Sequence, residues 1–191
     1  MRVASVATVI GAASIMACDA DAPAGPAGPD DRPSFNSGVI ASATGGGRAQ
    51  LPVGFSALRV SFSAVTKADG SAAGQFTQKY ESAGGTVDFS GTVTCASVDA
   101  ANGRAWIGGV ITRNRSTNPA VMGAIHQPGR DVWFRVVDYG EGDSPDDRTT
   151  VLGFEGAAGF NTSADYCAGQ PWAAGDANTW ALFDGNIQVR P

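Results

Sequence analysis

The sequence predicts an all-β protein, a single antiparallel β-sandwich or small β-barrel of about eight strands with long irregular loops. Apolar and polar residues alternate with a period of two in short segments from residue 38 onward, as in strands with one buried face. No segment after residue 38 shows sustained helical spacing with capping residues. The composition agrees, because 43% hydrophobic residues can fill a core and 26 glycines among 191 residues disfavour long helices.

Residues 1–17 have the features of a lipoprotein signal peptide. One arginine near the start supplies a positive charge, and residues 3–16 carry none. This apolar stretch is shorter than the about 20 residues that a helix needs to cross a bilayer. A basic start, a short apolar stretch and a small-residue exit are typical of an export signal. The alternative is a buried helix of the fold.

Residues 15–18 read IMAC and resemble the bacterial lipobox, an aliphatic residue, a variable one, a small one and then cysteine. The resemblance implies cleavage just before Cys18 and lipid attachment to its thiol. We therefore expect a membrane partner, reached through the N-terminal lipid, and a place on the extracytoplasmic side of the bacterial cell envelope. The alternative is ordinary signal-peptidase cleavage near residues 20–22, which would release a secreted soluble protein.

Residues 18–37 are expected to form a Pro/Gly/Ala-rich tether that precedes a β-domain over residues 38–191. Phe35 is the only large apolar side chain in the tether. Such a segment cannot bury enough surface to offset the entropy lost on ordering. As a flexible coil it would reach about 25 Å, which holds a domain clear of a membrane surface.

Alternation and neighbouring turns mark each predicted strand. Apolar Leu58 and Phe62, for example, alternate with polar residues, and a turn over residues 67–70 follows. The Asn102-Gly103 pair is a strong hairpin signal. Strands are therefore expected over residues 58–64, 75–80, 87–95, 104–112, 132–138, 149–154 and 185–190.

Three further segments fit none of these strands. The glycines at residues 45–47 lack the Lys-Ser/Thr pair and the helix start of a phosphate-binding loop. They are interpreted as a flexible or bulged strand segment. Residues 113–130 and 165–179 are expected to be long irregular loops, which is where functional residues usually lie on a β scaffold.

The three cysteines are expected to have two different roles, lipid attachment for one and a disulfide for the other two. If Cys18 carries lipid, Cys95 and Cys167 remain as a pair, which is expected to form a disulfide in an oxidising envelope compartment. A disulfide that closes a loop of about seventy residues would stabilise the fold by about 4 kcal/mol in the chain-entropy model. The alternative is two separate buried thiols.

Composition argues against several classes of function. The formal net charge of −5 and the lack of a basic cluster predict no nucleic-acid binding. One histidine and three cysteines nearly exclude the common zinc and haem sites. His126, the single imidazole, is expected to be a loop residue, and no GxSxG nucleophile motif is present. No catalytic residue is therefore assigned, and the protein is expected not to be an enzyme.

Residues 138–147, DYGEGDSPDD, hold five of the 18 carboxylates of the chain. Bunched carboxylates repel one another unless a cation or an arginine compensates. Calcium is the cation that suits such oxygen ligands, although the spacing does not match an EF-hand loop. The alternative is a solvated turn neutralised by Arg148. The candidate calcium ligands are Asp138, Glu141, Asp143, Asp146 and Asp147.

Trp106 and Trp133 lie in predicted strands, opposite the main apolar residues of their neighbours. If these rings are exposed on a β face, they would suit a sugar or an apolar ligand. The alternative is that both faces of the sheet are covered and that the two rings pack in the core or in a second layer.

An ordered set of motifs resembles a family of uncharacterised secreted bacterial β-domains and lipoproteins, similar to the post-COAP type domain. The motifs are TGGGR at 44–48, the alternating strand through Phe62, VTC at 93–95, WIGGVIT at 106–112, the VVDYGEG-to-PDD stretch at 136–147 and GNIQVR at 185–190. The resemblance covers about residues 38–191. It implies an exported all-β domain without established activity and adds no catalytic residue.

Together these observations favour an exported lipoprotein whose non-catalytic β-domain serves binding or envelope structure. One alternative is a barrel or sandwich that binds a small apolar or carbohydrate ligand in a pocket. A cavity lined by Trp106 or Trp133 would favour it. The other alternative is a hydrolase with an unrecognised Asp-based site, which converging carboxylates in a cleft would favour.

The substitution Cys18→Ala is expected to move the protein from the membrane fraction to the soluble or secreted fraction, because stable anchoring depends on the attached acyl chains. Membrane fractionation and mass spectrometry of the mature N-terminus measure this. A wild-type protein that is already soluble, with its N-terminus beyond residue 18, would contradict the assignment of Cys18.

Overall fold

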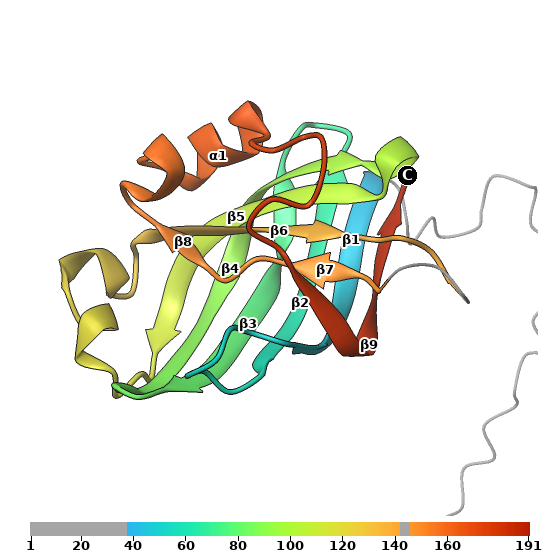
Figure 1. Ribbon diagram of the computed structural model, residues 1–191. Helices are drawn as coiled ribbons and strands as arrows, with labels where there is room; N and C mark the ends of the chain where they lie inside the picture. The colour runs from blue at the N-terminus through green and yellow to red at the C-terminus, as the bar shows by residue number, and fades with distance from the viewer. Residues whose placement is uncertain (1–37, 142–145) are drawn as a thin grey trace, which may run out of the picture. The chain divides into compact units, whose positions relative to one another are not determined.

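Antiparallel strands dominate the computed structural model, which describes residues 38–141 and 146–191 (Figure 1). Residues 1–37, with Cys18 and the predicted signal peptide and tether, lie outside the described residues. Within the described part of the chain, no helix has the length and hydropathy to cross a membrane. The elements are β1 (Val39–Ala49), β2 (Leu58–Lys67), β3 (Ala72–Ser82), β4 (Gly85–Asp99), β5 (Arg104–Asn114), β6 (Asp131–Val137), β7 (Arg148–Thr149), β8 (Gly153–Phe154), α1 (Ser163–Gly169) and β9 (Trp180–Arg190).

The strands form one sheet in the order β5-β4-β3-β2-β1-β9-β7-β6-β8, and an additional β5–β6 pairing closes it into a ring. Every pairing is antiparallel. The all-β prediction is therefore confirmed, and of the two architectures left open the closed ring is the barrel. The prediction of one continuous strand over residues 149–154 is wrong, because this stretch contains two short strands, β7 and β8, with an interruption between them.

The alternating residues of the long strands fill the inside of the ring. Phe62 and Phe76 both contact Phe134, with ring centroids 5.5 and 5.8 Å apart. Leu58, Ile107 and other inward residues around them are fully buried. The core of the barrel is thus packed with side chains, so a ligand site has to be sought elsewhere.

The glycines at residues 45–47 lie inside β1, as the strand interpretation expects. They allow β9 to approach closely, because a Cβ atom at Gly47 would lie 2.1 Å from the carbonyl oxygen of Asp184. The β1–β9 register also shifts between Arg48 and Ala49. The segment is therefore an irregular strand whose small residues admit the neighbouring backbone.

The ring has few backbone pairings around the short β7, which shares only two residue pairs with β9 and two with β6. Beyond these pairs, side chains of the acidic segment take the place of a neighbouring strand. The Asp147 carboxylate accepts from the backbone N–H of Ile187 at 2.6 Å, and Asp138 accepts from that of Val189 at 2.8 Å. Glu141 accepts from the side-chain amide of Asn186 at 3.0 Å. These bonds satisfy donors that the short β7 leaves unpaired.

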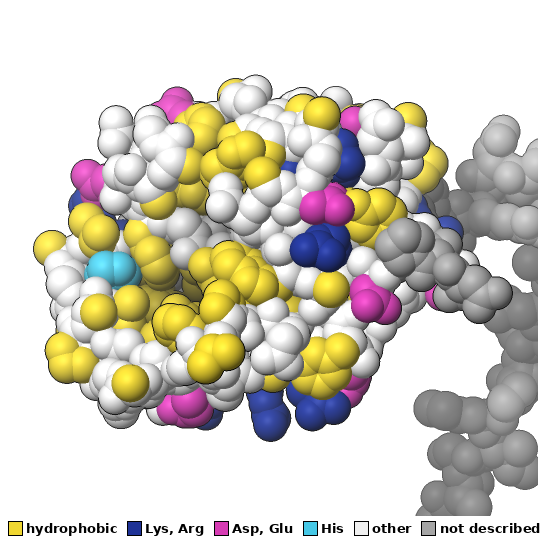
Figure 2. All heavy atoms as spheres, in the orientation of Figure 1, with side chains coloured by type: hydrophobic (Ala, Val, Ile, Leu, Met, Phe, Trp, Pro, Cys, Tyr) yellow, Lys and Arg dark blue, Asp and Glu magenta, His cyan; other side chains and the backbone are white. Residues whose placement is uncertain are grey.

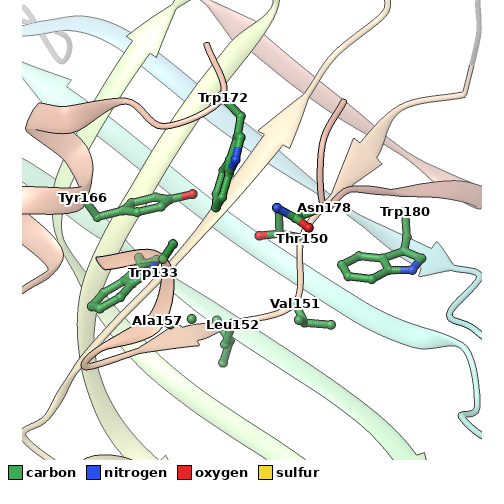
Figure 3. Close-up of a pocket in the computed structure, with 11 residues that line it drawn as sticks. Trp133, Thr150, Val151, Leu152, Ala157, Tyr166, Trp172, Asn178 and Trp180 are labelled. Atoms are coloured by element: carbon green, nitrogen blue, oxygen red, sulfur yellow. The ribbon is translucent and has the colours of Figure 1, made fainter. Parts of the chain in front are cut away.

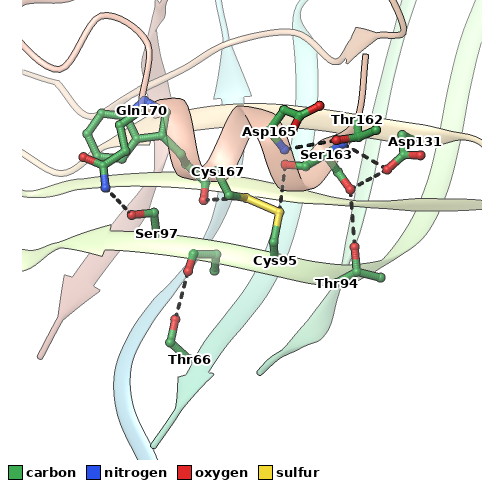
Figure 4. Close-up of a disulfide and its surroundings, with 12 residues drawn as sticks. Thr66, Thr94, Cys95, Ser97, Asp131, Thr162, Ser163, Asp165, Cys167 and Gln170 are labelled. Carbon is green, nitrogen blue, oxygen red and sulfur yellow. Dashed lines mark hydrogen bonds between the residues drawn. A yellow bond between two sulfur atoms is a disulfide. The ribbon is translucent and has the colours of Figure 1, made fainter. Parts of the chain in front are cut away.

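The short helix α1 covers part of the outer face of the barrel, and the disulfide Cys95–Cys167 joins it to β4 (Figure 4). The predicted cysteine pairing is therefore present in the structure. The expectation of no helix is wrong at α1. Thr162 caps it by accepting from the N–H of Asp165 at 3.1 Å, and seven residues are too few to show a periodic pattern.

The substitution Asp147→Ala is expected to lower the free energy of unfolding by about 1–3 kcal/mol, because it leaves the buried N–H of Ile187 without an acceptor. The N–H of Tyr139, which donates to the same carboxylate at 2.9 Å, also loses its partner. Urea unfolding measures the change. Asp146→Ala, an exposed neighbour, is the matched control and should change stability by less than about 0.5 kcal/mol. Equal stability of the two variants would contradict this role of Asp147.

The pH dependence gives a second readout of the same carboxylate. Burial raises the pKa of Asp147, and the charges of Asp138 and Glu141 also raise it, while its two N–H donors act in the opposite direction. A group with a higher pKa in the folded state contributes most stability below about pH 4, and this contribution falls as the pH rises through the folded-state pKa. The stability difference between wild type and Asp147→Ala is therefore expected to narrow as the pH increases.

Candidate functional site

The two tryptophans considered as ligand-facing lie on the outer face of β5 and β6, under a second layer made by α1 and the segment after it. Trp106 is fully buried, and its indole N–H donates to the carbonyl of Pro171 at 2.8 Å. A ligand-facing role of Trp106 is therefore wrong. Trp133 is 2% exposed and stacks on Tyr166 with ring centroids 5.6 Å apart. Second-layer packing is thus the correct alternative for both rings, although Trp133 also lines a pocket.

This pocket, called the aromatic pocket below, has a volume of about 390 Å³ and lies where the strand between β7 and β8 is interrupted (Figure 3). Figure 2 shows hydrophobic side chains gathered on this face of the molecule, with a hollow beside the histidine. The volume of the aromatic pocket is at the small end of ligand sites, which favours a ligand of about one ring. The lining residues are Trp133, Thr150, Val151, Leu152, Gly153, Ala157, Ala158, Tyr166, Trp172, Asn178 and Trp180.

The interruption of the strand comes from the way Thr150 is held. Its N–H donates to the carbonyl of Arg135 at 2.9 Å, and its hydroxyl accepts from the N–H of Arg135 at 3.0 Å. Its carbonyl accepts from Gln78, which reaches it at 3.1 Å from β3. Gly153 then lies against the ring of Trp133, since a Cβ atom there would be 2.4 Å from the indole nitrogen. These contacts leave open space beside Trp133.

Strained backbone is concentrated at the aromatic pocket. Four non-glycine residues in the described chain have positive φ, and three of them line the pocket: Ala158 at 56°, Trp172 at 55° and Asn178 at 61°. The fourth, Gln170 at 42°, ends α1 just before the pocket wall. Such conformations cost about 1–3 kcal/mol each and persist only where surrounding contacts impose them. Their clustering at one cavity is a property that functional sites commonly have.

The segment over residues 170–179, called the Trp172 loop below, is held by side chains from the outer face of β5 and β6. The carbonyls of three consecutive loop residues each accept from a different one of these side chains: Trp106 to Pro171, Arg135 to Trp172 and Arg104 to Ala173. Arg135 also donates to the carbonyl of Ala177 at 2.9 Å. The backbone of the loop is thus fixed before any ligand arrives.

The other end of the Trp172 loop is tied to the β6–β7 connection. The Tyr139 hydroxyl donates to the Asp176 carboxylate at 2.5 Å, and this hydrogen bond raises the pKa of Tyr139. Arg148 donates to the side chain and the carbonyl of Thr179 at 2.8 and 3.0 Å. With both ends anchored, the loop forms a rigid wall of the pocket.

Arg135 is a buried cation behind this wall. It is 0% exposed, and no carboxylate of the described residues lies within 4 Å of it. Burial lowers the pKa of its guanidinium, which nevertheless stays charged at neutral pH. Its Cζ atom lies 5.9 Å from the centre of the Trp172 ring, and its Nε has no hydrogen-bond partner in the described structure. The positive charge therefore lies next to the Trp172 ring, which lines the pocket.

The acidic segment does not converge on one point in its described part. Asp138, Glu141 and Asp147 accept from β9, and Asp146 is exposed. Asp143 lies outside the described residues. Over residues 38–141 and 146–191, no group of three or more His, Cys, Asp or Glu side chains could hold a metal ion. The calcium site therefore stays a prediction from the sequence, and the described residues give it no support.

His126 does not line the aromatic pocket and packs against the rings of Phe89 and Phe154, at 6.3 and 4.5 Å between centroids. Burial lowers its pKa, and its Nδ1 has no hydrogen-bond partner in the described structure. Among the described residues no Asp or Glu lines the aromatic pocket, so this lining lacks the carboxylates that an Asp-based hydrolase would need.

Comparison with known proteins leaves the family open. No protein-family model, no curated protein and no solved structure matches the chain. The resemblance to secreted β-domains of the post-COAP type stays a prediction, and the function has to be argued from the site itself.

Sequence analysis missed three of the four rings around the pocket. Tyr166, Trp172 and Trp180 all fall in or beside the stretch predicted as an irregular loop. The signal that could have found them is two tryptophans within nine residues of a long loop, together with the disulfide that pins its start. Trp133 was the one pocket residue that the alternation singled out.

The substitution Arg135→Met is expected to loosen the Trp172 loop, because the carbonyls of Trp172 and Ala177 lose their donor. The free energy of unfolding should fall by about 1–3 kcal/mol. Hydrogen exchange of residues 170–179 should accelerate. The exposed Arg113→Met is the control and should leave both measurements unchanged. Unchanged exchange in the Arg135 variant would contradict the anchoring role.

Proposed function

We propose that the β-domain is a non-catalytic binding domain and that the aromatic pocket holds one ring of a small ligand. The observation that carries the proposal is the clustering of three positive-φ, non-glycine residues around a cavity with four aromatic rings. Strain that costs stability is retained where it serves a function. The side chains of Ala158, Trp172 and Asn178 are not part of the hydrophobic core of the barrel.

The rigidity of the wall supports binding over a structural role alone. A ligand loses less affinity when the site does not have to be ordered on binding. The Trp172 loop receives hydrogen bonds on three consecutive carbonyls and is tied at its far end by Asp176 and Thr179. A cavity built and held in this way fits a preformed site for a small ligand.

The place of action is proposed from the N-terminus. The IMAC sequence supports lipid attachment at Cys18, and the tether would carry the domain away from the membrane surface. The disulfide between Cys95 and Cys167 is compatible with an oxidising, extracytoplasmic compartment. On this proposal the protein presents its pocket from the cell envelope.

The substitution Trp172→Ala is expected to abolish binding of one-ring probes while the barrel stays folded. The probes are benzyl alcohol, cyclohexanol, glucose, galactose and N-acetylglucosamine, titrated to millimolar concentration by tryptophan fluorescence. Phe183→Ala removes a half-exposed ring on β9 that does not line the pocket, so this control should bind like wild type. If none of the probes binds to the wild-type protein, the proposed function is wrong.

A further inference from the structure

We propose that the ligand of the aromatic pocket is an oxygen-rich ring without positive charge, that is, a neutral or acidic sugar residue. This inference rests on the proposed binding function and adds the chemical class of the ligand. Two observations support it. Several hydrogen-bond donors of the pocket have no partner among the described residues, and the guanidinium of Arg135 lies behind the pocket wall.

The hydroxyl of Tyr166 is the first of these atoms. Tyr166 is 2% exposed, yet its hydroxyl makes no hydrogen bond with the described residues. In Figure 3 it points from α1 into the pocket, toward the side of Thr150 and Asn178. Burial raises the pKa of Tyr166, so the group keeps its proton and acts as a donor. Because this oxygen is not among the buried side-chain atoms without a partner in the described structure, it is accessible from the pocket and can donate to an acceptor of a ligand.

Further donors surround the same space. The indole N–H groups of Trp133 and Trp172 make no hydrogen bond with the described residues, in contrast to that of Trp106, which donates to Pro171. The Trp172 nitrogen faces the same side as the Tyr166 hydroxyl in Figure 3. Thr150 accepts from the N–H of Arg135, which leaves its hydroxyl proton to donate. The pocket therefore offers donors in excess, and its ligand has to supply acceptor oxygens.

The charge near the pocket argues against a cationic ligand, which is the other class of ligand that aromatic rings attract. A cage of tryptophan and tyrosine rings also suits quaternary ammonium groups, because the ring faces are negative. Here the guanidinium of Arg135 already lies 5.9 Å from the Trp172 ring, and no charged residue lines the pocket. The carboxylate of Asp176 is partly committed to Tyr139 and Arg148. A second cation in the pocket would be repelled by Arg135 in surroundings that screen poorly.

The shape of the pocket agrees with a sugar ring. A pyranose has apolar faces made by C–H groups and a rim of oxygens. The apolar faces can lie against the partly exposed rings of Trp172 and Trp180, while the rim meets Tyr166 and Asn178. A flat hydrocarbon would fill the same space but would leave the donors unpaired.

The test compares six-membered rings of similar size that differ in one property. Glucose, galactose, N-acetylglucosamine and glucuronate carry oxygens without positive charge, cyclohexanol lacks most of the oxygens, and glucosamine adds a positive charge. We expect at least one uncharged or acidic sugar to bind about tenfold more tightly than cyclohexanol and glucosamine. The relative affinity of glucuronate shows whether the site takes acidic or neutral sugars.

Tyr166→Phe is the variant that tests the donor. It should weaken sugar binding about tenfold and leave cyclohexanol binding unchanged. Because the hydroxyl makes no hydrogen bond with the part of the chain that the structure describes, the variant should unfold at the same or a higher denaturant concentration than wild type. Its unfolding midpoint therefore shows that any loss of sugar binding is not a loss of folding.

The outcomes distinguish the two proposals. If cyclohexanol or benzyl alcohol binds in a Trp172-dependent manner and no sugar binds more tightly, the pocket function stands and the sugar class is wrong. Tight binding of glucosamine, or sugar binding that is unchanged in Tyr166→Phe, would also overturn the sugar class. If no ring probe binds at all, the proposed function itself fails.

Discussion

The hydrogen bonds that buried side chains of β5 and β6 donate to the Trp172 loop are the interactions on which the candidate site depends. Arg135 contributes two of them and has no carboxylate within 4 Å among the described residues. A charge in such a place is stabilised by fixed carbonyl dipoles, and these carbonyls are in turn satisfied by the charge. The side chains on the outer face of β6 therefore contact the Trp172 loop and α1, and those on its inner face pack in the barrel core.

This arrangement links the barrel to the pocket in one chain of constraints. The ring of strands fixes β6, and β6 fixes the loop through Arg135. The loop holds Trp172 in a conformation that a free chain would avoid. The disulfide between Cys95 and Cys167 fixes α1, which carries Tyr166 against Trp133. The pocket is thus assembled from β6, residues 150–153, residues 157–158, α1, the Trp172 loop and β9, none of which could form it alone.

The sequence predicted well what depends on local pattern. Alternation and turn signals located β2 to β6 and the end of β9, and the count of cysteines identified the pair Cys95–Cys167. The strand β1 was expected only as a flexible or bulged segment at residues 45–47. Features that depend on distant contacts were missed. Helix α1 has seven residues and is held by a disulfide, and β7 and β8 are separated by contacts of Thr150 with Arg135 and Gln78. The position of Trp172 depends on Arg135, 37 residues earlier in the chain, and no local rule connects the two.

The most direct test of the account is to follow the four indole N–H signals by two-dimensional NMR during titration with the sugar that binds most tightly. We expect the signals of Trp133 and Trp172, whose N–H groups make no hydrogen bond within residues 38–141 and 146–191, to shift strongly. The signal of Trp106 should stay in place, because its N–H is already bonded to Pro171. Saturable sugar binding that leaves the Trp133 and Trp172 signals unmoved, or that moves Trp106 instead, would contradict the aromatic pocket as the binding site.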